Sequence, residues 1–187
     1  MSRTVQVSEY DPCWTRAFAN EADALRGVFG HDLIAIHHIG STSVPGLSAK
    51  PIIDILVVLR DTESIGRFSD RMEQLGYRVR GECLDAEIPG TPGRYYFSKD
   101  DKGIRTHQVH ACAEGHSEIV DKIAFRNYLS AHQRVTAEYG TLKRELAQRF
   151  RQDNIGYMRG KDAFVRAALD RAREWTQSAS GPARADV

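Results

Sequence analysis

One carboxylate stands out because it interrupts an apolar segment of the chain. Asp54 lies inside the segment 52–59, which reads IIDILVVL, and thirteen residues before it Ser41 follows Gly40 at the end of another apolar segment. A carboxylate in such a strand is costly to bury unless a cation or hydrogen-bond donors meet it. The group that meets Asp54 is therefore the first clue to function.

The loop between these two segments carries groups that suit a phosphate. Gly40 allows a close approach of the backbone, and successive N–H groups in a tight loop can converge on one point. Hydroxyl and ammonium donors follow in the order Ser41, Thr42, Ser43 and Lys50. A carboxylate repels a phosphate unless a cation lies between them, and Mg²⁺ is the usual hard cation there. The pattern predicts a phosphate site with Mg²⁺ as cofactor. An ordinary surface loop with a Lys50–Asp54 pair is the alternative.

Other side chains are candidates to complete this site. His110 can serve as a metal ligand or a general base, because its ordinary pKa is close to neutrality. Alternation along the strand predicted at 105–112 places Arg105 and His107 on one face and His110 on the other. A histidine that is merely hydrogen-bonded in the sheet is the alternative. The remaining candidates are Glu82 or Glu87 as a further acid and metal ligand, and Arg94 and Arg105 as anion-binding cations.

The helical half of the chain adds weaker candidates. Tyr157 and Lys161 stand four residues apart, so they share a helix face, and the tyrosine could stack on a base. For Lys161 we favour a solvated helix face. A basic run follows a helix whose other side is apolar; it contains Lys143, Arg144, Arg149 and Arg151. We also interpret this run as a solvated helix face, with RNA contact a distant second interpretation.

These residues must be positioned by an α/β arrangement. Composition and alternation predict strands at 33–38 and 52–59 on either side of the loop, and further strands at 77–80, 94–98 and 105–112. Apolar residues at helical spacing predict helices over 14–29 and 65–75, and a helical pattern from Ser117 onward. We expect one domain over residues 1–176 and a disordered tail over 177–187.

Composition narrows the class of protein. The 187 residues are 41% hydrophobic and 27% charged, with a formal net charge of +1. This balance makes a dedicated nucleic-acid binder unlikely on the usual electrostatic grounds, while a small anionic ligand stays open. The chain shows no apolar run of membrane-spanning or signal-peptide length, and its three cysteines lack metal-ligand spacing. A cytoplasmic protein is expected; oligomeric state is left open.

A longer stretch of the chain resembles a known family. The segment HIGSTSVPGLSAKPIIDI, from His38 to Ile55, resembles the GrpB-like proteins of the nucleotidyltransferase superfamily. The resemblance extends to YDPCWTRAF, GRYYF, RTHQVH, FRNYLSAH and LKREL. It implies an α/β (α+β) fold, in which a nucleotidyltransferase-type mixed sheet is flanked by helices and followed by a C-terminal helical segment. The ligand cleft is then expected beside the glycine-serine turn.

The same resemblance frames the functional hypotheses. The wider superfamily has Asp-x-Asp or Asp-x-Glu after the turn and a third acid on a later strand, which together hold two Mg²⁺ ions. Here Gly40, Ser41 and Asp54 match, whereas Leu56 occupies the place of the second acid. One hypothesis is Mg²⁺-dependent transfer of a nucleotidyl group from a nucleoside triphosphate to an unknown acceptor.

Two alternatives stay open beside it. One is a non-catalytic module that binds a nucleotide or another phosphate-bearing small molecule, with a link to coenzyme A metabolism that the resemblance suggests. The other, weaker alternative is a transition metal held by His38, His107 or His110.

Overall fold

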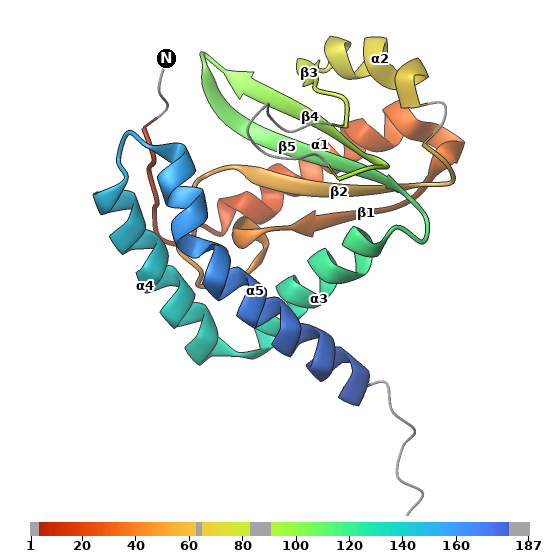
Figure 1. Cartoon of the computed structure of the whole chain (residues 1–187). Coiled ribbons are helices and arrows are strands. Elements are labelled where there is room, and N and C mark those ends of the chain that lie inside the picture. The colour runs from red at the N-terminus through yellow and green to blue at the C-terminus, as the bar shows by residue number, and fades with distance from the viewer. Residues whose placement is uncertain (1–3, 63–64, 83–90, 180–187) are drawn as a thin grey trace, which may run out of the picture.

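The protein is a five-stranded mixed sheet with helices on both faces, as seen in the computed structural model shown in Figure 1. The structure describes residues 4–62, 65–82 and 91–179. The strands are β1 (Leu33–Ile39), β2 (Ile53–Leu59), β3 (Tyr77–Val79), β4 (Arg94–Asp101) and β5 (Ile104–Ala113), in the spatial order β1-β2-β5-β4-β3. The helices are α1 (Cys13–Phe29), α2 (Ser69–Gln74), α3 (Ser117–Ala131), α4 (Gln133–Arg149) and α5 (Asn154–Ala179). The predicted α/β class is confirmed.

Strand β2 is apolar along nearly its whole length because it is covered on both faces. It pairs antiparallel with β1 on one side and parallel with β5 on the other. Residues Ile53, Ile55 and Val57 point toward a core cluster that includes α1, whereas Leu56 and Val58 belong to a cluster on the opposite face with α3. A strand buried on both faces reads as a continuous apolar run, so Asp54 is the exception that requires explanation.

Helices α4 and α5 lie together beside the sheet (Figure 1). Tyr139 of α4 stacks on Phe164 of α5, with ring centroids 4.7 Å apart. The loop after β1 contributes Val44 and Leu47 to the same apolar cluster. The C-terminal helices therefore pack directly against the loop that follows Gly40.

One irregularity changes the predicted faces of β5. Lys99 of β4 pairs with His107, but the next residue, Asp100, pairs with Arg105, so β5 carries an extra residue at this point. The Arg105 guanidinium donates to the Tyr96 hydroxyl at 2.8 Å and to Asp100 at 2.5 Å. The predicted separation of Arg105 from the face of His110 is therefore wrong at the bulge, because Tyr96 packs against the His110 ring with centroids 5.4 Å apart.

Two further observations concern the chain as a whole. No helix in the described parts of the chain has the length and apolar character required to cross a membrane. Helix α5 continues to Ala179, so the first residues of the predicted tail are helical, and residues 180–187 lie outside the described residues.

Candidate functional site

The glycine-serine turn and Asp54 meet on the same side of the sheet. The pairing of β1 with β2 places Ile39 opposite Asp54, so the turn that begins at Gly40 starts beside the carboxylate. Gly40 has φ 69° and ψ −170°, a conformation that is essentially restricted to glycine. A Cβ at this position would overlap Asp54 Oδ2 and would lie 2.9 Å from the Cβ of Asp54. The expected proximity of turn and carboxylate is confirmed, and it depends on the missing side chain of Gly40.

Two of the turn's hydroxyls hold the loop in shape. Thr42 is buried, and its hydroxyl lies 3.0 Å from His38 Nε2 and donates to the Ile52 carbonyl at 3.3 Å. The Ser43 hydroxyl donates to the Gly40 carbonyl at 2.6 Å. Both residues were expected as anion donors, but these bonds engage their oxygen atoms inside the loop. Ser41 instead lies near Tyr139 of α4, where its hydroxyl acts to lower the pKa of that phenol.

Four lysine side chains act on Asp54 from different parts of the chain. They are Lys50 in the loop, Lys122 in α3, Lys143 in α4 and Lys161 in α5. Burial raises the pKa of Asp54 to about 6, although all four lysines lower it. No hydrogen bond or ion pair to the Asp54 carboxylate is found within the described ranges. The site is thus a single desolvated carboxylate among several amines, held near each other by the fold.

Two of these lysines have other partners as well. Lys50 donates to Asn154 at 2.9 Å and lies over the Tyr157 ring, 4.9 Å from its centroid. Lys122 Nζ lies 3.3 Å from a carboxylate oxygen of Glu118. These contacts give the two ammonium groups partners other than Asp54.

Lys143 differs because its amine is buried without a hydrogen-bond partner among the described residues. The residue is 2% exposed, and its Nζ lies over the Tyr139 ring, 4.5 Å from the centroid. Burial and the charge of Lys161 lower the pKa of Lys143 to about 7, while Asp54 acts in the opposite direction. Burial also lowers the pKa of Lys161. An amine in this state gains a counter-charge only from a ligand or from Asp54.

The interpretation of Lys143 and Lys161 as solvated helix positions is therefore wrong. Each lies one turn after a buried tyrosine of its helix: Lys143 follows Tyr139 by four residues and is buried, and Lys161 follows Tyr157 by four and is half-buried. That spacing was visible in the sequence and was the signal that could have identified them. Tyr157 is 2% exposed, so its predicted role in stacking on a base does not fit the structure.

His110 shares the face of Asp54 but is separated from the turn. It pairs with Leu56, two positions along β2 from Asp54, and its buried Nδ1 has no hydrogen-bond partner among the described residues. Burial, together with the charges of Lys122 and Arg94, lowers the pKa of His110 well below its ordinary value. The imidazole is therefore neutral at pH 7.

Two further candidates for the site, Arg94 and Glu82, lie toward the other end of the sheet. Arg94 pairs with Cys112, four residues along β5 from the partner of Asp54, a distance of roughly 13 Å. Its guanidinium donates to both carboxylate oxygens of Glu118 at 2.7 and 3.0 Å. Glu82 accepts a hydrogen bond from the Gly93 backbone at 3.3 Å, at that same end. Glu87 lies outside the described residues.

The donor set does not fit a two-metal magnesium site. Mg²⁺ prefers near-octahedral oxygen coordination, usually with more than one carboxylate. Leu56 is completely buried and apolar at the position of the second acid, and Gln108 stands beside Asp54 on β5. In the described parts of the chain no group of three or more histidine, cysteine, aspartate or glutamate side chains is arranged to hold a metal ion. The residues around Asp54 are amines, which repel a cation.

The three histidines proposed for a transition metal do not converge. His38 stacks on Phe18 of α1, with centroids 4.7 Å apart, and burial lowers its pKa to about 4. His107 lies 3.8 Å from Glu21 of α1. His110 lies on the opposite face of the sheet, so the three cannot bind one ion.

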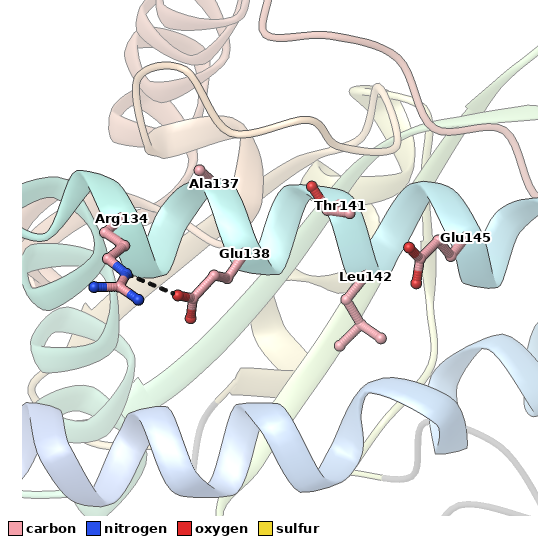
Figure 2. Close-up of a pocket in the computed structure, with 6 residues that line it drawn as sticks. All are labelled: Arg134, Ala137, Glu138, Thr141, Leu142 and Glu145. Atoms are coloured by element: carbon pink, nitrogen blue, oxygen red, sulfur yellow. Dashed lines mark hydrogen bonds and ion pairs between the residues drawn. The ribbon is translucent and has the colours of Figure 1, made fainter.

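A surface hollow elsewhere on the molecule is separate from this site. It has a volume of about 530 Å³ and lies along α4, as Figure 2 shows. Its lining includes Leu142, Thr141 and the exposed ion pair of Arg134 with Glu138. None of the residues that surround Asp54 lines it. We therefore place the candidate site at Asp54.

Most of the chain is similar to known proteins. The profile of the family described as GrpB protein matches residues 4–171. UPF0157 protein YqkA of Bacillus subtilis is 39% identical over 173 residues, which is 92% of this chain and 48% of YqkA. The crystal structure of conserved protein GrpB from Enterococcus faecalis superimposes with a TM-score of 0.85 at 38% identity, covering 92% of this chain and 99% of that chain.

More distant matches extend the comparison. A dephospho-CoA kinase of Mycobacterium leprae is 28% identical, over 90% of this chain and 46% of the kinase. The chain thus spans about half the length of this kinase and of YqkA. The Cid1 poly(U) polymerase shares the fold, with a TM-score of 0.51 at 14% identity over 76% of this chain and 45% of that chain.

Proposed function

The chain belongs to the GrpB protein family, and from that premise we propose that its lysine-lined site binds a phosphate-bearing small molecule without a divalent metal ion. One observation carries the proposal: four lysines from separate elements act electrostatically on the single carboxylate of Asp54 beside the glycine-serine turn. Amines that are partly desolvated attract a phosphate more strongly than exposed ones, because the effective dielectric constant is lower there.

The turn supports the same conclusion. Gly40 has no side chain, so the backbone can lie against the Asp54 carboxylate. The next residue, Ser41, lies near Tyr139. A ligand at this place lies among the lysines rather than among acids. The site therefore substitutes fixed ammonium groups for the metal ions that a two-metal site would supply.

The comparisons suggest which phosphate-bearing molecules to test first. The Cid1 polymerase shares the fold, and its solved complexes include one with UTP analogue UMPNPP, so nucleotides belong in a binding screen. The relative from M. leprae is a dephospho-CoA kinase, so dephospho-coenzyme A belongs there too. Nucleotidyl transfer stays a prediction, and the lack of a second acid at Leu56 favours binding without transfer.

Titration of the protein with inorganic pyrophosphate tests the proposal. We expect heat of binding in buffer that contains EDTA, with no strengthening when EDTA is replaced by excess Mg²⁺. The variant Lys161→Met should bind about tenfold more weakly, because it removes one half-buried positive charge near the ligand. ATP and dephospho-coenzyme A are titrated in the same way to rank the ligands.

The control variant also removes one positive charge, but from a position outside the candidate site. Arg134 is 93% exposed at its side chain and lies on the hollow along α4, so Arg134→Met should leave the affinity unchanged. If no phosphate compound binds more tightly than about 1 mM, the proposed function is contradicted. Binding that requires Mg²⁺ would contradict the metal-free form of the proposal.

A further inference from the structure

Lys143 is a group that the proposed function does not by itself explain. Anion binding requires positive charge, yet this amine is enclosed in the protein and has no hydrogen-bond partner among the described residues. A protonated amine in such surroundings is costly, and the protein can avoid the cost by releasing the proton. Lys143 is therefore suited to gain positive charge when an anionic ligand arrives.

The contacts of Lys143 lead directly to the turn. Its Nζ lies over the ring of Tyr139, and Ser41 lies near the hydroxyl of the same tyrosine. Ser41 follows Gly40, which lies against the Asp54 carboxylate. The buried amine is thus linked to the turn through a single aromatic side chain.

We propose that Lys143 is the residue that responds to the bound anion: the negative charge of the ligand drives a proton from solvent onto its buried amine, so that anion binding and proton uptake are linked. This inference rests on the proposed function, because it needs an anion at the site. The step forms one N–H bond, consumes one solvent proton and changes no oxidation state.

The surrounding charges set the direction of this linkage. Asp54 on β2 favours the protonated amine, whereas Lys161 on α5 and Arg144 on α4 oppose it. With burial, these charges lower the pKa of Lys143 to about 7. A dianion beside the turn adds negative charge near the amine, so the pKa of Lys143 rises on binding.

The linkage predicts a pH-dependent affinity. Above pH 7 the free protein carries a neutral Lys143, so each bound anion must be accompanied by a proton. Wild-type affinity should then fall by up to tenfold per pH unit as the pH rises from 7 toward 9. Sodium sulfate is the probe, because its charge stays constant over this range, and the affinity is measured by calorimetry at constant ionic strength.

Three variants separate this role from a structural one. Lys143→Met keeps the length of the side chain and should bind sulfate with an affinity that no longer depends on pH between 7 and 9. Lys161→Met should bind more weakly but keep the slope, because Lys143 remains. Asp54→Asn should also keep a slope, which excludes the carboxylate as the source of the proton effect.

A direct measurement follows the amine itself. In NMR spectra of protein with ¹³C-labelled lysine, the Cε resonance that disappears in Lys143→Met should titrate near pH 7 in chloride and at least one pH unit higher with saturating sulfate. Sulfate binding with an unchanged Lys143 midpoint, or a Lys143 midpoint above 9 without sulfate, would overturn the inference. If no lysine resonance responds to sulfate or pyrophosphate, the proposed function fails instead, so the two failures are distinguishable.

Discussion

Replacement of Gly40 by alanine should destabilise the folded protein by about 2–6 kcal/mol. The backbone at Gly40 adopts a conformation that a side chain makes unfavourable, which alone costs about 1–3 kcal/mol. The new methyl group would also overlap the Asp54 carboxylate, so β2 or the turn must shift, at a further cost of about 1–3 kcal/mol. The measurement is urea unfolding at pH 7.5, analysed by linear extrapolation.

A second glycine in the same loop supplies the control. Gly46 has φ 78°, but a Cβ there would meet no atom within 4 Å. Gly46→Ala therefore introduces backbone strain without the overlap, and it should cost about 1–2 kcal/mol. Equal losses for the two variants would show that contact between Gly40 and Asp54 does not matter to the fold.

Replacement of Asp54 by asparagine should stabilise the protein without ligand by about 2–3 kcal/mol at pH 7.5. The pKa of Asp54 in the folded protein is about 6, compared with its ordinary 3.8, so ionisation of the carboxylate is disfavoured by folding. Asparagine removes that charge and keeps a similar shape. A stabilising change at a polar position is expected where the native residue does not serve the stability of the fold.

The stabilising effect of Asp54→Asn should depend on pH in a defined direction. Between about pH 4 and pH 6 the folded protein binds more protons than the unfolded chain, so wild-type stability falls as the pH rises through this window. Above pH 6 the carboxylate is ionised in both states and the full penalty is present. The advantage of Asp54→Asn should therefore be near zero at pH 4, grow up to pH 6 and stay constant above it. Urea unfolding in chloride buffer at several pH values measures it.

The opposite result has a clear meaning. If Asp54→Asn loses about 2–4 kcal/mol at pH 7.5, the carboxylate is a structural partner of the surrounding amines, since breaking a buried pair leaves an uncompensated charge. The alternative interpretation of Asp54 as part of a Lys50–Asp54 pair would then hold.

The sequence was sufficient to predict the framework of the site. Strands on either side of the turn follow from two apolar runs, and their pairing was expected to bring Asp54 beside Gly40 and Ser41. Local pattern suffices here because the partners are joined by a short loop. The fold class was predicted from the same strands together with the helical pattern after Ser117.

The charges around Asp54 could not be assigned with the same rules. Lys122, Lys143 and Lys161 lie far along the chain from Asp54, and only the packing of α3, α4 and α5 brings them to it. A lysine on a helix is usually solvated, so composition favoured the wrong interpretation for Lys143 and Lys161. The spacing of both lysines from apolar residues on the same helix face indicated burial, whereas their residue type indicated exposure.

Hydroxyl groups and the bulge show a second limit. Thr42 and Ser43 have the residue types of an anion-binding loop, but their oxygen atoms bond to groups in and around that loop. Arg105 changes face because one extra residue enters β5, and strict alternation cannot anticipate such an insertion. In both cases the decisive information is three-dimensional.

The affinity of Asp54→Asn for inorganic pyrophosphate in EDTA tests the central claim most directly, because a lysine site and a metal site predict opposite signs. In a site where amines bind the anion, removal of the neighbouring negative charge should strengthen binding by about fivefold or more at pH 7.5. In a site where Asp54 holds a metal ion for the ligand, the wild type should not bind in EDTA, and in Mg²⁺ the same change should abolish binding. Tighter binding by Asp54→Asn without metal is the result that we predict. Loss of binding by the variant, together with a requirement for Mg²⁺ in the wild type, would contradict the account.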